Sequence, residues 1–252
     1  MSEDSPLNDI RIGEVSKKWA ESNQLYVHHE KSLSSTNDIA KSEAFNEALL
    51  PEALCLFLAD QQSAGRGRGK NSWIGGQPGH ALLSSWSYLL MAKPQPITSC
   101  LMGLAVYRAL AATWPFLSWS LKAPNDIYIG EKKVAGILLE TILQGDEVRI
   151  VVGIGLNVLS SPPEITTAGS ILGSMPRGIP LLGHDWTSFL DRLLYELTDA
   201  LSSCESPLNP PARMSLLKAL NDNPNLGEYF ESVAADGTMI TASGKTILWS
   251  EL

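Results

Sequence analysis

The segment DQQSAGRGRGKNSW, residues 60–73, contains the residues best suited to binding an anion. Arg66, Arg68 and Lys70 alternate with glycines within five residues. The glycines let main-chain N–H groups approach a ligand, and the arginines present planar donors to phosphate or carboxylate. The segment therefore predicts an anion-binding loop. A solvated basic loop without a ligand has the same pattern and stays as the alternative.

A second cluster lies in LKAPNDIYIGEKKVAGILLE, residues 121–140. Pro124 restricts the residue before it to extended backbone, so we expect Lys122, Asn125 and Asp126 at a sharply shaped strand end. A lysine beside an oxygen-rich pair suits a nucleoside triphosphate with Mg²⁺. Pro-Asn-Asp is also a common turn sequence, and that alternative stays open.

Glycines extend this pattern along the chain. Lys133 comes three residues before Gly136, where the missing side chain permits close approach of a ligand. In VGIGLN, residues 152–157, Gly153 and Gly155 fall on one face of a predicted strand. That face is expected to be open to a ligand, although glycines can also simply loosen a strand.

The elements that would position these residues predict an α+β fold. Apolar and β-branched runs predict strands at residues 24–32, 53–61, 80–90, 118–130, 132–143 and 145–159. Periodicity predicts helices at residues 34–50, 96–114 and 185–204. A loop at 160–180, a linker at 205–211 and three short strands within 228–252 complete the pattern. We therefore expect helices around a mainly antiparallel or mixed sheet, with a small C-terminal β appendage.

Composition excludes several classes of protein. A net charge of −8 argues against a general nucleic-acid binder. The first residues resemble no secretory signal, and no apolar run is long enough for a membrane helix. Three widely spaced cysteines predict reduced thiols in a cytoplasmic protein, and the four histidines form no metal-ligand pattern.

The motifs together resemble one family. In sequence order, SSTND, QSAGRGR with a downstream tryptophan, LKAPND with KKVAGILLE, and VGIGLNV resemble the catalytic domain of biotin protein ligases, in the biotin/lipoate protein ligase superfamily. The resemblance spans about residues 25–159. It implies a class II aminoacyl-tRNA synthetase-like fold, with a catalytic domain over residues 1–205 and a small, truncated C-terminal β domain over residues 206–252.

The resemblance implies an ATP- and Mg²⁺-dependent ligase. Such an enzyme activates biotin to biotinyl-5′-AMP and transfers it to a lysine of a biotin carboxyl carrier protein domain. We expect a monofunctional cytoplasmic enzyme with no DNA-binding domain and no nucleic-acid or membrane partner. A homodimer is compatible with this prediction. The alternatives are a lipoate or other acyl-protein ligase of the same fold, and a biotin-binding protein with weakened catalysis.

The family's functional residues carry over to matching positions. The implied biotin site consists of Ser35, Thr36, Asn37, Gln62, Gly65, Arg66, Gly136, Gly153, Ile154 and Gly155. The implied ATP contacts are Arg68, Trp73, Lys122, Asn125, Asp126 and Asn157. Arg68, Lys122 and Lys133 are implied as catalytic, because their cations would meet charge that develops on the carboxylate and α-phosphate. Mg²⁺ would arrive with ATP near Asp126, without a cage of protein ligands.

Three details qualify this assignment. Thr36 could instead be only a helix N-cap. The family usually has tryptophan where this chain has Ala123, and arginine where it has Asn71. These two positions are where we expect the protein to differ from other biotin ligases.

Overall fold

The structure is a computed structural model that describes residues 6–7, 10–49, 52–204 and 206–249. Its residues group into two compact units. Unit 1 consists of residues 1–93 with 134–187, and unit 2 consists of residues 94–133 with 188–252. No helix among the described residues is long and apolar enough to cross a membrane.

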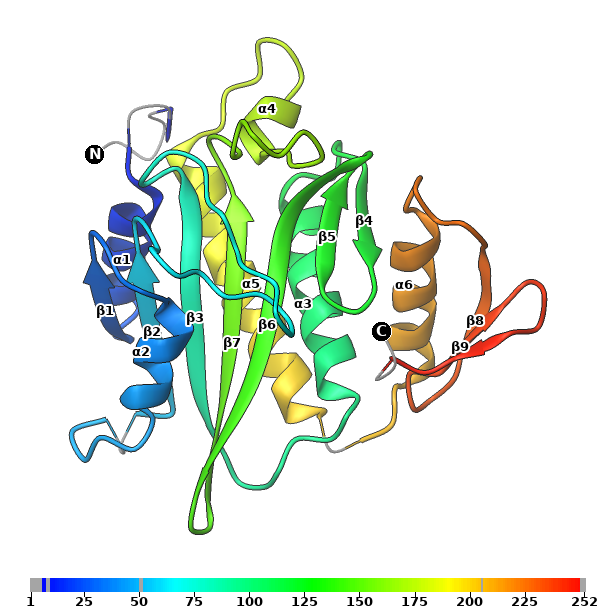
Figure 1. The fold of residues 1–252 in the computed structure, drawn as a ribbon, viewed down its shortest axis with the longest axis horizontal. Helices are drawn as coiled ribbons and strands as arrows, with labels where there is room; N and C mark the ends of the chain where they lie inside the picture. Colours follow the sequence, from blue (N-terminus) through cyan, green and yellow to red (C-terminus); the bar gives the residue numbers. More distant parts are fainter. Residues whose placement is uncertain (1–5, 8–9, 50–51, 205, 250–252) are drawn as a thin grey trace. The chain divides into compact units, whose positions relative to one another are not determined.

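The strands of the main sheet agree with the predicted α+β class. They are β1 (Tyr26–Glu30), β2 (Leu54–Ala59), β3 (Ala81–Leu90), β4 (Trp119–Lys122), β5 (Asp126–Ile129), β6 (Lys132–Gln144) and β7 (Glu147–Asn157). Their order in the sheet is β1-β2-β3-β7-β6-β5-β4 (Figure 1). β1 pairs with β2 in parallel, whereas β2–β3, β3–β7, β6–β7 and β4–β5 are antiparallel. The sheet is therefore mixed but mainly antiparallel.

In unit 1, helices α1 (Ile12–Ser22) and α2 (Thr36–Ser42) cover opposite faces of the sheet. Successive side chains of a strand point to opposite faces, and every residue of β2 is buried, so both faces of β2 are covered. On one face, Trp19 of α1 packs against Trp86, with ring centroids 6.0 Å apart. On the other face, Ala40 of α2 packs in a cluster with Phe57. We call this second side the α2 face.

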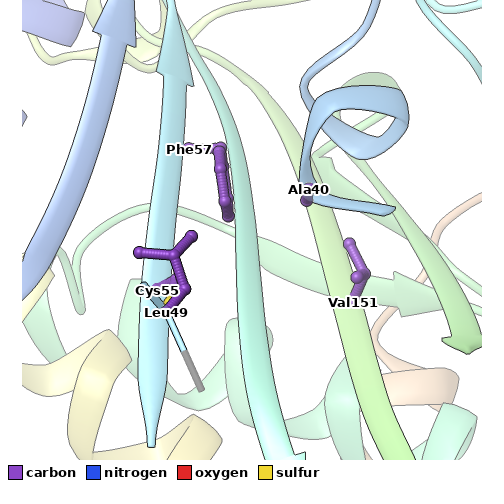
Figure 2. Packing of buried hydrophobic residues seen from close by; sticks show 5 residues of the cluster. All are labelled: Ala40, Leu49, Cys55, Phe57 and Val151. Atoms are coloured by element: carbon purple, nitrogen blue, oxygen red, sulfur yellow. The ribbon is translucent and has the colours of Figure 1, made fainter. Parts of the chain in front are cut away.

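The cluster under α2 fixes that short helix on the sheet. Ala40 faces Phe57 of β2 and Val151 of β7, and Leu49 and Cys55 complete the cluster (Figure 2). All five side chains are at most 5% exposed. Since burial of apolar surface stabilises by about 25 cal/mol per Å², this packing holds the N-terminal residues of α2 in a fixed place.

Unit 2 contains the remaining long helices and the small sheet. Its helices include α3 (Thr98–Thr113), α6 (Pro210–Asn221) and most of α5 (Gly183–Ser202). The predicted C-terminal strands are confirmed as β8 (Phe230–Val233), β9 (Met239–Thr241) and β10 (Thr246–Ile247), in the order β10-β9-β8. The side chain of Asn221, at the end of α6, bonds the N–H and C=O of Phe230 and so fastens β8 to α6.

Several predicted boundaries were wrong for identifiable reasons. The helix expected over residues 34–50 ends at Ser42, because the chain then turns so that Leu49 returns to the α2 cluster. The linker expected over residues 205–211 instead contains the start of α6. There Asn209 caps the helix by accepting a hydrogen bond from Ala212 N–H at 2.9 Å, and Pro210 occupies the first helical position, which suits proline.

Other segments contain elements that the sequence interpretation lacked. α1 was not predicted, although its buried residues Ile12, Val15, Ser16 and Trp19 have helical spacing. The loop over residues 160–180 contains the short helix α4 (Ile171–Ser174). The single strand expected over residues 118–130 is two antiparallel strands, β4 and β5, with the turn at Ala123–Asn125.

Candidate functional site

The α2 face carries two rows of residues across β3, β7 and β6 in which three of the six residues are glycines. Residues directly opposite each other in an antiparallel ladder share a face. One row consists of Ser85, Gly153 and Leu138, and the next consists of Leu83, Gly155 and Gly136. The three glycines leave space above the sheet that other side chains can enter.

Ile154 does not face this space. It lies between Gly153 and Gly155 on β7, and its side chain is 2% exposed. Its ladder partners Ser84 and Ile137 place it on the opposite face of the sheet. Because strand side chains alternate, the Ile154 side chain is part of the core and only its backbone borders the glycine rows.

Thr36 and Gln62 meet at the N-terminus of α2. The N–H and hydroxyl of Thr36 both donate to Gln62 Oε1, at 2.7 and 3.1 Å. Ser35 is the N-cap residue and its side chain makes no capping hydrogen bond. The alternative role of Thr36 as N-cap is therefore wrong, since Thr36 is the first helical residue and its hydroxyl is directed to Gln62.

Asn37 fills the space above Gly153. A Cβ added at Gly153 would lie 2.2 Å from Asn37 Oδ1. Ser85 Oγ donates to that same oxygen at 2.5 Å and also lies 2.9 Å from Thr36 Oγ1. All these side chains are at most 4% exposed except Gln62, which is half-buried. The structure thus brings Thr36, Asn37 and Gln62 together in one buried polar group.

Trp73 fills the space above Gly155. A Cβ at Gly155 would lie 2.5 Å from Trp73 Cε2, so only glycine lets the indole ring lie this close to the strand. The ring packs against a cluster that includes Leu33, Ala59 and Leu83. Its Nε1 is buried and has no hydrogen-bond partner among the described residues. The glycine face that was expected to be open is therefore occupied by Asn37 and Trp73 in this structure.

The basic segment forms a hairpin over residues 65–73. Trp73 N–H donates to Gly65 O at 2.9 Å, Gly67 N–H to Asn71 O at 2.9 Å, and Asn71 N–H to Arg68 O at 3.2 Å. Gly69, at the tip, has a φ of +65°, which glycine adopts without steric cost. Arg68 and Lys70 are exposed on this hairpin. The backbone N–H and C=O of Asn71 both bond within the turn, and the residue is exposed.

Arg66 ties the hairpin to α2 and β6. Its guanidinium donates to Asp38 Oδ1 at 2.6 Å and to Glu140 Oε1 at 3.1 Å. Lys41 lies 2.9 Å from Glu140 and 3.4 Å from Asp38, so two cations alternate with two carboxylates. The hydrogen bond from Arg66 to Asp38, together with both carboxylate charges, raises the pKa of Arg66. In this structure the guanidinium of Arg66 is thus held by carboxylates.

The pKa values of the two carboxylates, Glu140 and Asp38, are shifted downward. Burial would raise the pKa of Glu140, but hydrogen bonds from Lys41 and Asn37 and the charges of Lys41 and Arg66 lower it overall. Burial would likewise raise the pKa of Asp38, and the hydrogen bonds and charges of Arg66 and Lys41 lower it. Both groups are therefore ionised at neutral pH.

A cavity of about 330 Å³ lies beside the hairpin. It is lined by residues 60–65 and 72–77 with Ala81 and Leu83. The lining includes Gln62, Gly65 and Trp73 from the predicted site. This space is large enough for part of a small-molecule ligand.

Asn157, at the end of β7, has one satisfied and one unsatisfied polar atom. Its Nδ2 donates to Gly169 O at 3.0 Å, which ties β7 to the loop over residues 160–180. Its Oδ1 is buried and has no partner among the described residues. A buried acceptor without a partner costs about 1–3 kcal/mol, so a bound donor would relieve that cost.

Unit 2 holds the remaining predicted residues around the β4–β5 turn. Lys122 and Asp126 are register partners at the ends of the two strands, and Asn125 precedes Asp126 in the turn. Lys133 Nζ lies 2.7 Å from Asp126 Oδ1. Ala123 is half-buried in the same turn. The structure thus brings Asp126 and Lys133 together as an ion pair.

Sequence interpretation missed two residues of unit 1. Ser85 belongs to the buried polar group with Thr36, Asn37 and Gln62, and Glu140 hydrogen-bonds to that group. Ser85 lies in a run of serines on a buried strand, and nothing local distinguishes it from Ser84 or Ser87. Glu140 ends the GILLE motif but is 103 positions from Asn37, its hydrogen-bond partner at 2.9 Å. Only the register of β3, β7 and β6 shows that both residues share a face with Gly153.

Comparison with known proteins gives consistent matches. The model of the Biotin/lipoate A/B protein ligase family matches residues 29–157. The Bifunctional ligase/repressor BirA of Bacillus subtilis is 34% identical over 161 residues, which are 62% of this chain and 46% of that protein. The Biotin--[acetyl-CoA-carboxylase] ligase of Paracoccus denitrificans is 35% identical over 167 residues, which are 62% of this chain and 66% of that protein.

Solved structures show the same similarity. Biotin protein ligase from Aquifex aeolicus in complex with biotin and ATP superposes with a TM-score of 0.63 at 25% identity, covering 88% of this chain and 95% of that chain. The match to the Bacillus subtilis protein spans less than half the length of that protein.

Proposed function

This chain belongs to the Biotin/lipoate A/B protein ligase family, and we propose that it is a biotin–protein ligase. It would activate biotin with ATP to biotinyl-5′-AMP, with release of pyrophosphate. It would then transfer the biotinyl group to a lysine of a biotin carboxyl carrier protein domain. The Aquifex aeolicus ligase, whose structure contains biotin and ATP, supports this choice of substrates.

The buried polar group of Thr36, Asn37, Gln62 and Ser85 carries the proposal for biotin. The ureido ring of biotin has two N–H donors and a carbonyl acceptor, which require fixed partners in a small pocket. Asn37 Oδ1 and the hydroxyls offer acceptors. The Gln62 amide nitrogen, which makes no hydrogen bond to the described residues, offers a donor. Lipoate and octanoate have no such polar head, so this group favours biotin over them.

The cations account for activation of the carboxylate. Attack of a carboxylate on the α-phosphate brings two anions together, and fixed cations stabilise the charge that develops. We assign this role to Lys133 and Lys122 of unit 2 and to Arg68 of the hairpin. The ion pair with Asp126 at 2.7 Å would hold the Lys133 ammonium in place until the substrates arrive.

Contacts with the nucleotide are assigned to a mixed set of residues. Trp73 offers an apolar ring, and Asn157 offers the unsatisfied buried Oδ1 to a donor such as an adenine amino group. Asn125 and Asp126 would serve the phosphates. Among the described residues, no group of three or more His, Cys, Asp or Glu could hold a metal ion. Mg²⁺ commonly binds through one carboxylate and the phosphates of its substrate, and Asp126 fits that role.

The test is ATP–pyrophosphate exchange with biotin, lipoate and octanoate in turn. We expect exchange with biotin alone. Exchange with lipoate or octanoate but not biotin would establish the other acyl ligase, and biotin binding without exchange would establish a weakened binding protein.

Lys133→Ala should lower exchange by about 10²–10³-fold. Lys132→Ala, at the exposed neighbouring lysine, is the matched control and should lower it far less. Transfer to a purified carrier domain then tests the second step.

A further inference from the structure

The side chain of Glu140 contacts both the buried polar group and the hairpin. It lies on the α2 face of β6, opposite Val151, and its side chain is 19% exposed. Oε2 accepts from Asn37 Nδ2 at 2.9 Å, whereas Oε1 accepts from Lys41 Nζ at 2.9 Å and from Arg66 Nη2 at 3.1 Å. Its two oxygens thus bind different parts of the site.

Glu140 is the closer of two acceptors that orient the Asn37 amide, since Asn37 Nδ2 lies 2.9 Å from Glu140 Oε2 and 3.5 Å from Leu138 O. An ionised carboxylate only accepts hydrogen bonds, so the NH₂ of Asn37 must face Glu140. The Asn37 oxygen then faces Ser85 and the space above Gly153. If the amide were reversed, its oxygen would face the carboxylate and the acceptor above Gly153 would be lost. The carboxylate therefore fixes the acceptor on which biotin recognition rests under the proposed function.

Glu140 also holds the hairpin through Arg66. The hairpin of residues 65–73 carries Trp73, which covers Gly155 next to Asn37. Asp38 is a second carboxylate on Arg66, but no hydrogen bond joins Asp38 to Asn37 through their side chains in the described residues. Asp38 therefore shares one of the two functions of Glu140 and can serve as its control.

We propose that Glu140 is a positioning residue that couples the orientation of Asn37 to the attachment of the hairpin through Arg66. The proposal rests on the proposed function for the identity of the ligand, but its structural part does not need a ligand. A bound ligand that engages Asn37 would favour the attached hairpin, and a detached hairpin would loosen Asn37.

Calorimetric measurement of biotin affinity separates the two contacts of Glu140. Glu140→Ala should raise the Kd for biotin by about tenfold, because Asn37 loses its charged partner. Glu140→Gln keeps an acceptor oxygen for Asn37 and should restore the Kd to within about threefold of wild type. Asp38→Asn loosens the hairpin but leaves Asn37 bonded to Glu140, so it should raise the Kd by no more than about threefold. An unchanged Kd in Glu140→Ala, or an equal rise in Asp38→Asn, would overturn the proposal.

Tryptic cleavage after Arg68 and Lys70, without ligand, measures hairpin attachment. Glu140→Ala, Glu140→Gln and Asp38→Asn should all be cleaved several-fold faster than wild type, since each removes a charge that holds Arg66. Asn37→Ala should also speed cleavage, and the double variant with Glu140→Ala should be no faster than Glu140→Ala alone. Rate increases that multiply in the double variant, so that the free-energy changes add, would refute the coupling. Unfolding midpoints confirm that each variant is folded.

The two measurements also distinguish the two proposals. If the wild type binds no biotin, the proposed function fails, and the cleavage rates still decide whether Glu140 couples Asn37 to the hairpin. If the wild type binds biotin but the two rate increases multiply in the double variant, the proposed function stands and the coupling fails.

Discussion

Two arginines, Arg66 and Arg149, fasten loops on the α2 face of unit 1 by different means. Arg149 of β7 is 1% exposed and donates to the carbonyls of Leu49 and Glu52 at 2.9 and 2.8 Å, and to Ser87 O at 3.4 Å. Arg66 has a side chain that is 39% exposed, and its partners are carboxylates on α2 and β6. One arginine is buried among neutral acceptors, whereas the other lies at the surface among charges.

The difference predicts that the two arginines contribute unequally to stability. Loss of Arg149 would leave the Glu52 carbonyl without a donor among the described residues, and Leu49 O would keep only the N–H of Glu52. A carbonyl that loses its donor away from water costs about 1–3 kcal/mol. Loss of an exposed ion pair costs about 0–1 kcal/mol, because water replaces the partner and salt screens it. Arg149 therefore holds the chain firmly at Leu49 and Glu52, whereas the contacts of Arg66 add only a weak attachment of the hairpin.

The largest effect is expected from Arg149→Met, which keeps the length of the side chain but removes its donors. We expect the free energy of unfolding to fall by about 1–3 kcal/mol, because the Glu52 carbonyl loses its donor and Leu49 O keeps only the N–H of Glu52. Urea unfolding measures the change. Arg177→Met, at an exposed arginine, should stay within about 0.5 kcal/mol of wild type. A fall of less than 1 kcal/mol in Arg149→Met would remove the distinction between the two arginines.

A smaller effect is expected from Arg66→Met. The free energy of unfolding should fall by less than about 1 kcal/mol, since the ion pairs are exposed. The hairpin amides of Gly67 and Trp73, which donate to Asn71 O and Gly65 O, should exchange hydrogen several-fold faster. Hydrogen exchange read by NMR gives both values. A global loss of stability as large as that of Arg149→Met would show that the hairpin is not held separately.

Some of this site follows from local sequence. Gly153 and Gly155 were correctly expected to share a strand face, because a period of two is a local property. What fills the space above them could not be predicted, since Asn37 and Trp73 come from segments about 80–115 positions away along the chain. The same holds for Glu140, whose role depends on strand register.

The fold shows the same division. Long apolar runs such as β2 and α3 were predicted near their observed bounds. The end of α2 at Ser42 was not, because a tertiary contact, the return of Leu49 to the α2 cluster, decides it. At α6, two prolines were interpreted as linker residues, although Asn209 before them is a favourable N-cap.

The smallest expected effect concerns pH, and it applies to Arg66 but not to Arg149. The pKa values of Glu140 and Asp38 lie below their ordinary values of 4.5 and 3.8 in the folded protein. A depressed carboxylate pKa contributes stability that is present above the ordinary value and is lost as pH falls through the folded value. The attachment of the hairpin should therefore be complete at pH 7 and weaken only in acid.

The measurement compares wild type with Arg66→Met at pH 7, 5 and 3. The ratio of their hydrogen-exchange rates at Gly67 and Trp73 cancels the intrinsic pH dependence of exchange. We expect this ratio to be nearly constant from pH 7 to 5 and to move toward one as the carboxylates become protonated below their ordinary pKa values, because protonated carboxylates no longer hold the guanidinium. The stability difference caused by Arg149→Met should persist, since carbonyl acceptors do not titrate. A ratio that stays unchanged down to the lowest pH at which both proteins remain folded would mean that Asp38 and Glu140 do not hold the hairpin through charge.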